Sequence, residues 1–248
     1  MKILLTNDDG YLAPGILTLA KALEEKHEVI VVAPEHEHSG KSHSITLWHP
    51  LLVRKVELEG VKGPVYSVSG TPADCVRVAM EHILEEPVDL VFSGCNLGYN
   101  AGMDIVYSGT VSAAIEANVY DIPAVAVSAQ WIKGTANFEF AVKKAMEIFE
   151  ETKDFVMSQT MVLNINVPYE EDIKGVKVCA MGGVIYDYYF MEPKENGDFT
   201  LQVKGRNKTK LEEGTDRYYL DKNYATVTPL IYDLTNRALI EECKKSFL

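Results

Sequence analysis

The sequence predicts an α/β protein with a mainly parallel sheet and a separate C-terminal hairpin. Up to about residue 180, short apolar runs alternate with segments whose apolar residues recur at helical spacing. The run at residues 28–33 is continuously apolar, as in a strand that is buried on both faces. After residue 180 the alternation stops, and aromatic residues flank an Asn-Gly turn.

The first unit is predicted to be β-α-β. Residues 2–6 form a short apolar strand, and residues 14–26 carry apolar side chains at helical spacing. Pro14 suits the first turn of that helix. Residues 28–33 are a continuous apolar run and form the second strand, so the crossover between the two strands should be right-handed.

The next elements are a pair of strands and a capped helix. Residues 44–58 and 64–68 are predicted to be strands, and they form the pair. Thr71 is the expected N-cap of the following helix, with Pro72 in its first position. Asp74 completes a capping box with Thr71.

The same alternation continues to the end of the core. Strands are predicted at residues 88–92, 124–128 and 161–167, and helices at residues 111–119 and 138–149. Because strands alternate with helices, the sheet should be mainly parallel.

The C-terminal part is predicted to hold a hairpin at residues 186–190 and 199–203. A last strand at 226–230 and a terminal helix at 236–245 follow it. An aromatic hairpin that leaves an α/β core needs a surface to cover its apolar side. We interpret it as an arm that packs on another subunit, with an isolated loop as the alternative.

We therefore divide the chain into two parts. Residues 1–180 form the α/β core, and residues 181–248 hold the arm, the last strand and the terminal helix.

Composition excludes several classes of function. The 248 residues include 36 acidic and 24 basic side chains, and the net charge of −12 argues against duplex nucleic acid as a partner. The N-terminus does not resemble a signal peptide, and no stretch approaches the roughly 20 apolar residues of a membrane span. The four cysteines form no C-x-x-C pair. We expect a cytoplasmic protein with reduced thiols and no membrane partner.

Polar clusters follow several of the predicted strands. They are Asp8-Asp9, residues 39–43, residues 94–104 and residues 108–110, of which the last opens a helix. Ligands of an open parallel sheet bind beyond the carboxyl ends of its strands. We expect these four clusters to meet on one rim of the sheet.

Asp8 and Asp9 are the candidate metal ligands. Adjacent carboxylates repel each other unless a cation lies between them, and oxygen ligands suit Mg²⁺, Mn²⁺ or Ca²⁺. Ser39 and Asn96 offer further neutral oxygens, which favours a metal site. The alternative is that one Asp caps the following turn while the other is solvated.

Ser108, Gly109 and Thr110 are the candidate phosphate site, because a helix N-terminus presents free N–H groups and a positive dipole end. The loop containing Asn96, Gly98 and Asn100 should also contact substrate, since its glycines let the backbone approach a ligand. A flexible loop and an ordinary helix cap are the alternatives.

His43 is a candidate catalytic residue, as an imidazole can protonate a leaving alkoxide or hold a phosphate oxygen. A structural histidine is an equally good interpretation.

These residues together predict metal-assisted hydrolysis of a phosphate ester. The cation would hold a phosphoryl oxygen and lower the pKa of a bound water, while Asp8 or Asp9 orients that water or takes its proton. The helix N-terminus at Ser108–Thr110 would stabilise charge on the other oxygens. A non-catalytic nucleotide sensor and a phosphatase for another small phosphoester remain as alternatives.

The chain resembles the SurE family, stationary-phase survival proteins that act as metal-dependent nucleoside monophosphate phosphatases. The similar segments occur in family order over nearly the whole chain. They are TNDDG (6–10), APEHEHSGKSHSIT (33–46), SGTPADCV (69–76), SGCNLGYNAGMDIVYSGTVSAA (93–114) and TPLIYDLT (228–235).

The resemblance implies a three-layer αβα Rossmann-like core and a 5'-nucleotidase, which is a phosphoric monoester hydrolase. It implies one divalent cation per subunit, Mg²⁺ or Mn²⁺, held by Asp8, Asp9, Ser39 and Asn96. The implied substrates are nucleoside 5'- and 3'-monophosphates and, in some members, short polyphosphate. The implied assembly is a homodimer, in some members a tetramer, that exchanges the C-terminal arm.

Two positions beside the candidate site depart from the family pattern. Leu97 and Tyr99 stand where many members carry Arg and Pro. The preferred base therefore stays open.

Overall fold

The computed structural model describes residues 1–183, 187–206 and 210–247. Its strands are β1 (Lys2–Thr6), β2 (Glu28–Pro34), β3 (Val53–Val56), β4 (Val65–Val68), β5 (Leu90–Leu97), β6 (Ala124–Ala129), β7 (Val162–Val167), β8 (Val176–Val178), β9 (Asp187–Pro193), β10 (Phe199–Arg206) and β11 (Ala225–Leu230). Its α-helices are α1 (Pro14–Leu23), α2 (Pro72–Val78), α3 (Gly109–Val119), α4 (Phe138–Met157), α5 (Asp216–Asp221) and α6 (Ile240–Lys245). Shorter helical turns are η1 (Ala79–Ile83), η2 (Gly102–Tyr107) and η3 (Arg237–Leu239).

A nine-stranded sheet in the order β3-β4-β2-β1-β5-β6-β7-β11-β8 forms the centre of the molecule. The strands from β4 to β7 in this order run parallel, whereas β3 is antiparallel to β4 and β11 is antiparallel to β7. The predicted mainly parallel sheet is therefore confirmed. The strand order reverses at β1, which lies between β2 and β5, and this is where an open α/β sheet binds its ligands.

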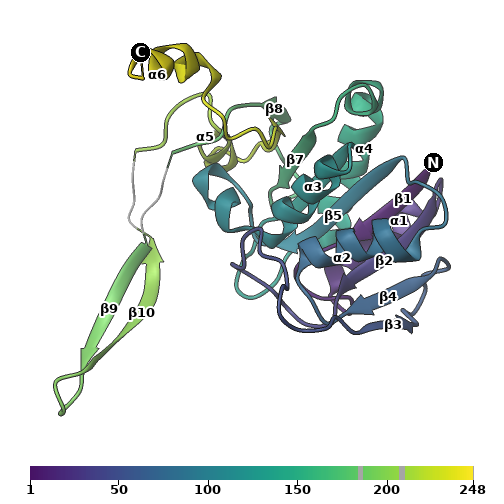
Figure 1. Ribbon diagram of the computed structural model, residues 1–248, viewed down its shortest axis with the longest axis horizontal. Helices are drawn as coiled ribbons and strands as arrows, with labels where there is room; N and C mark the ends of the chain where they lie inside the picture. Colours follow the sequence, from purple (N-terminus) through teal and green to yellow (C-terminus); the bar gives the residue numbers. More distant parts are fainter. Residues whose placement is uncertain (184–186, 207–209, 248) are drawn as a thin grey trace.

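Helices cover both faces of the sheet and give three layers (Figure 1). Successive residues of a strand point to opposite faces. Thus Leu5 packs with the residues of α1 and α4, whereas Leu4 packs with those of α2 and α3. Both side chains are fully buried. The αβα layering confirms the fold class that the sequence and the family resemblance predict.

Several local predictions match the structure. The first strand has the predicted bounds. At α2, the Thr71 hydroxyl accepts from Asp74 N at 3.1 Å, and Asp74 Oδ2 accepts from Thr71 N at 2.9 Å. The predicted capping box is therefore present, with Pro72 at the start of the helix.

The predicted strand at 44–58 is wrong over most of its length, because only β3 pairs with β4. Two residues of this segment bond to side chains of α2 and its N-cap. Thr46 N and Oγ1 donate to Asp74, and Ser44 O accepts from Thr71 Oγ1. Leu52 exchanges hydrogen bonds with Ser69, directly after β4, and the side chain of Trp48 is exposed.

Other boundaries differ in the structure. The first helix ends at Leu23, α3 begins at Gly109 and α4 continues to Met157. Strand β5 begins at Leu90 and runs on to Leu97, since Asn96 and Leu97 still pair with β6. The terminal helix is split into η3 and α6, while β8 and α5 were not predicted.

The predicted C-terminal hairpin is confirmed as the antiparallel pair β9–β10, which extends away from the body (Figure 1). Residue 186, its predicted first residue, lies outside the described residues. The division of the chain at residue 180 stays a prediction, and β11, although C-terminal, belongs to the central sheet. Within the described parts of the chain, no helix combines the length and the apolar character that a bilayer crossing requires.

Candidate active site

The adjacent Asp8 and Asp9 lie directly after β1, at the point where the strand order reverses. Asp8 is almost fully buried, with 3% of its surface exposed, and Asp9 is half-buried. The carbonyl oxygen of Asp8 accepts from His38 N at 2.7 Å, and Asp9 Oδ2 accepts from Leu97 N at 3.1 Å. The pair is thus held between the loop after β2 and the end of β5.

The N-terminus of α3 meets the same carboxylates. Thr110 Oγ1 donates a short hydrogen bond to Asp8 Oδ1. Ser108 is the N-cap, and its hydroxyl accepts from Val111 N at 3.1 Å. A Cβ atom on Gly109 would lie 2.7 Å from the Cβ of Asp8, so only glycine allows this approach. The positive end of the helix dipole therefore faces Asp8.

Both carboxyl groups are harder to ionise than ordinary aspartates. Burial raises the pKa of Asp8, and the hydrogen bonds from Thr110 only partly oppose this. Burial, and then the charge of Asp8, raise the pKa of Asp9 to about 6. Glu37 adds a smaller repulsion to each. The site therefore carries more negative charge than its surroundings compensate.

The other two candidate metal ligands lie on the segments that flank the Asp pair. Ser39 is exposed and follows His38, and its hydroxyl donates to Glu37 Oε1 at 2.7 Å. Asn96 is the second-last residue of β5, and its amide nitrogen donates to Gly98 O at 2.9 Å. The amide oxygen of Asn96 is thus the atom that would bind a cation.

These residues fit a hard divalent cation. Two adjacent carboxylates with few donors, a hydroxyl and an amide oxygen are the ligand types that Mg²⁺ and Mn²⁺ prefer. Among the described residues, no group of three or more His, Cys, Asp or Glu side chains is placed to hold a metal ion, so Ser39 and Asn96 would have to supply neutral ligands beside the two carboxylates. A cation at this site would complete its coordination with water and substrate.

The glycines of the loop after β5 have different neighbours. A side chain at Gly94 would collide with the backbone of Val127, and one at Gly102 would collide with Arg217. Those two positions therefore require glycine so that the neighbouring segments of the chain can pack closely. A Cβ atom on Gly98 would have the Cβ of Trp131 as its nearest neighbour, at 4.0 Å, so the backbone here remains open to a ligand.

Asn100 is tied to the ends of β6 and β7. Its carbonyl oxygen accepts from the Asn164 and Asn166 side chains at 2.9 Å, and its own Nδ2 donates to Ser128 Oγ at 2.9 Å. The residue is buried, so it fixes the course of the loop. Its contact with phosphate stays a prediction.

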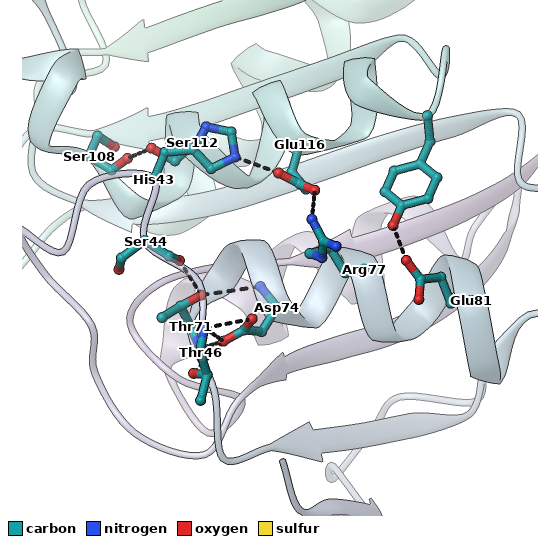
Figure 2. Close-up of polar contacts among 11 residues, drawn as sticks. His43, Ser44, Thr46, Thr71, Asp74, Arg77, Glu81, Ser108, Ser112 and Glu116 are labelled. Atoms are coloured by element: carbon teal, nitrogen blue, oxygen red, sulfur yellow. Dashed lines mark hydrogen bonds and ion pairs between the residues drawn. The ribbon is translucent and has the colours of Figure 1, made fainter. Parts of the chain in front are cut away.

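His43 does not bond to the Asp pair. Its Nε2 lies 2.6 Å from Glu116 Oε2 (Figure 2). Its ring packs edge-on against Tyr232, with centroids 5.5 Å apart. Glu116 follows Thr110 by six residues on α3, which is about 9 Å along the axis. The catalytic role of His43 therefore stays a hypothesis, and its observed contact is with the side of α3.

Two exposed apolar side chains border the open backbone at Gly98. Leu97 precedes it, and Trp131 follows β6, the strand beside β5. The Tyr99 hydroxyl is buried instead, and burial raises the pKa of its phenol. Of the Leu97 and Tyr99 side chains, Leu97 is thus the one that is exposed beside the open backbone at Gly98.

Glu37, Glu116 and Trp131 were missed by the sequence reasoning. Glu37 carried a signal, because it lies two residues before Ser39 in a loop already assigned to the site. Glu116 and Trp131 carried none, since each meets the site only through contacts between distant segments.

Comparison with known proteins supports the same family along the whole chain. The profile of the family described as "Survival protein SurE" matches residues 3–187. A Clostridium tetani protein named 5'-nucleotidase SurE is 47% identical over 249 residues, with 100% of both chains covered. A Clostridium botulinum protein of the same name is 48% identical over 252 residues, again with 100% of both covered.

A solved structure agrees with these sequences. The crystal structure of the SurE protein from Aquifex aeolicus superposes with a TM-score of 0.87 at 37% identity, covering 100% of both chains. The family profile, the full-length relatives and the fold all lead to one assignment: the chain belongs to the SurE family.

Proposed function

We propose that this chain is a metal-dependent 5'-nucleotidase that hydrolyses the phosphate ester of nucleoside monophosphates. The observation that carries the proposal is the under-compensated Asp8–Asp9 pair against the N-terminus of α3. The full-length relatives named 5'-nucleotidase SurE support it.

Asp8, Asp9, Ser39 and Asn96 would hold one divalent cation, Mg²⁺ or Mn²⁺. Such a cation supplies positive charge to a phosphoryl oxygen and makes a water molecule more acidic. The carboxylates also have a role of their own. Asp9, which is half-buried and accepts a backbone hydrogen bond from Leu97, is suited to orient the attacking water and accept its proton.

The helix N-terminus would stabilise the phosphoryl group. Ser108, Gly109 and Thr110 place backbone N–H groups and a helix dipole beside Asp8, where the phosphate would meet the cation. The open backbone at Gly98 lies next to Leu97, whose N–H bonds to Asp9. His43 is our remaining candidate for the acid that protonates the leaving alkoxide.

The base of the nucleotide would pack on Leu97 and Trp131. Neighbouring strands lie about 4.8 Å apart, so Trp131 after β6 is roughly 10 Å from the end of β1, which is two strands away. That separation suits a base whose phosphate lies at Asp8. Nucleoside 3'-monophosphates and short polyphosphate are further proposed substrates.

The arm β9–β10 would pack on a second copy of the chain, as a homodimer or a tetramer. Apolar side chains of this hairpin are exposed, among them Tyr189, Met191, Phe199 and Leu201. A two-stranded hairpin is not stable alone, so an arm of this composition requires a covering surface.

The test is phosphate release from a panel of nucleoside 5'- and 3'-monophosphates and short polyphosphate, with Mg²⁺, Mn²⁺ or EDTA. Wild type should release phosphate only with a cation, and Asp8→Asn should abolish this release. Asp154→Asn is the matched control, because it makes the same chemical change at an exposed position of α4.

Each other outcome has a definite meaning. Binding of nucleotides without turnover would favour a sensor, and release from other small phosphoesters alone would favour another phosphatase. Full activity in EDTA or in Asp8→Asn would overturn the metal site at β1.

A further inference from the structure

The loop that carries Ser39 has no regular structure of its own. Residues 35–52 connect β2 to β3 without forming a helix or a strand. Such a loop can hold Ser39, a proposed metal ligand, in place only if contacts with other segments fix the loop. One fixed point is known beside Ser39, where His38 N donates to the carbonyl of Asp8 at 2.7 Å.

The second set of fixed points follows Ser39. Ser42 Oγ donates to Val106 O at 2.6 Å, and Ser42 N donates to Tyr107 O at 3.0 Å, just before α3 begins. Further along, Thr71 Oγ1 donates to Ser44 O at 2.6 Å (Figure 2). These hydrogen bonds attach the loop to the N-cap of α2 and to the residues just before α3.

A buried carboxylate lies at the centre of these contacts. Glu116 on α3 is 4% exposed, and its two oxygens have different partners. Oε2 is 2.6 Å from His43 Nε2 in the loop, and Oε1 is 3.4 Å from Arg77 on α2 (Figure 2). Glu116 therefore joins the loop to both helices.

The contact with His43 is the stronger of the two. The His43 side chain is 20% exposed and Arg77 is 43% exposed, and the distance to His43 is shorter. Arg77 can be solvated without Glu116, whereas His43 lies between the carboxylate and the ring of Tyr232. A shielded, short contact of this kind is worth more than a solvated one.

We propose that Glu116 is a positioning residue, which holds the Ser39 loop in place through His43 and so increases the affinity of the site for a divalent cation. This inference rests on the proposed function. Ser39 lies between the anchors at His38 and at Ser42–His43. Loss of the His43–Glu116 contact removes part of the later anchor, so the short stretch of chain that carries Ser39, a proposed ligand, is held less firmly by Ser42 alone.

The test measures cation binding to the full chain by calorimetric titration with Mn²⁺, without substrate. Glu116→Gln removes the charge and keeps the shape, and it should weaken Mn²⁺ binding about tenfold, as loss of supporting contacts to metal ligands does elsewhere. Excess Mn²⁺ should then restore phosphate release to near the wild-type rate.

Tyr120→Phe is the matched control. Tyr120 lies at the end of the same helix, and its hydroxyl donates to Glu81 at 2.6 Å without contacting the loop. This variant should bind Mn²⁺ as the wild type does. An equal loss of affinity in Tyr120→Phe would show that general packing of α3 is responsible, and would overturn the inference.

His43→Ala provides a second variant in case Glu116→Gln does not fold. It should weaken Mn²⁺ binding by a similar factor. The double variant should bind Mn²⁺ no more weakly than either single variant, since both substitutions remove the same contact. Wild-type Mn²⁺ affinity in Glu116→Gln or in His43→Ala would overturn this inference but not the proposed function. A wild type that binds no cation would overturn the proposed function as well.

Discussion

Two buried acidic sites in this molecule differ in how the chain compensates their charge. Asp216, at the start of α5, is fully buried and accepts three backbone hydrogen bonds. They come from Gly102 N at 2.7 Å, Gly182 N at 2.8 Å and Arg217 N at 2.7 Å. This carboxylate ties together three segments that are distant in sequence.

The charge of the Asp8–Asp9 pair is compensated less completely. Asp8 accepts hydrogen bonds from Thr110 and from its own backbone N–H, yet burial still raises its pKa. Asp9 accepts one N–H from Leu97, and burial and the charge of Asp8 raise its pKa to about 6. A buried carboxylate needs donors or a counter-charge. The chain supplies donors where a carboxylate holds the fold together, and it leaves the charge under-compensated where we propose that a cation binds.

The largest expected effect comes from changing the under-compensated site. Asp9→Asn keeps an oxygen that accepts from Leu97 N but removes a charge from the cation site. Phosphate release from nucleoside 5'-monophosphates should fall about a thousandfold, because cation-based stabilisation contributes several kcal/mol. The melting temperature in EDTA should not fall, since a repulsion between carboxylates is removed.

This result is checked by steady-state rates and by thermal unfolding of the same samples. Near-normal turnover in Asp9→Asn would remove Asp9 from the site. A much lower melting temperature would show that Asp9, like Asp216, serves the fold.

The compensated site should behave in the opposite way. Asp216→Ala leaves three buried N–H groups without their acceptor, and the free energy of unfolding should fall by about 3 kcal/mol. Urea unfolding followed by circular dichroism measures this. Asp221→Ala, on the exposed end of the same helix, should change stability by less than about 0.5 kcal/mol. Equal stability of the two variants would contradict the comparison.

Much of the fold follows from the sequence because the signals are local. The strand at β1 is an apolar run between polar residues, and the start of α2 is fixed by a capping box whose partners are three residues apart. The meeting of Asp8 with Thr110 also follows, because parallel strands of one sheet end on one edge.

The errors arise where distant contacts override local pattern. Residues 44–52 carry strand-forming side chains, yet hydrogen bonds to Asp74 and Thr71 hold the loop away from a ladder. Strand β8 has only three residues at the edge of the sheet, too few for a periodic signal. Likewise, the pairing of His43 with Glu116 joins residues 73 positions apart, and no spacing rule predicts it.

The smallest expected effect is a pH dependence that only the under-compensated site produces. The pKa of Asp9 is raised to about 6 by burial and by the charge of Asp8, whereas an ordinary aspartate has a pKa of 3.8. The folded chain thus binds a proton that the unfolded chain releases. The resulting stability is fully present below pH 3.8 and is lost as the pH rises through about 6.

In EDTA, the wild type should therefore lose about 2 kcal/mol more than Asp9→Asn between pH 4 and pH 7. A pKa difference of about 2 corresponds to roughly 3 kcal/mol, and partial solvent exposure of Asp9 reduces this. Urea unfolding at several pH values measures the difference, and parallel profiles of the two proteins would contradict it. Saturating Mg²⁺ should reverse the trend in the wild type, because a cation binds the ionised pair and stabilises the fold more as the pH rises. The ionised pair would thus destabilise the metal-free chain and stabilise the chain with its cation bound. This reversal distinguishes a ligand site from a carboxylate that holds the fold together.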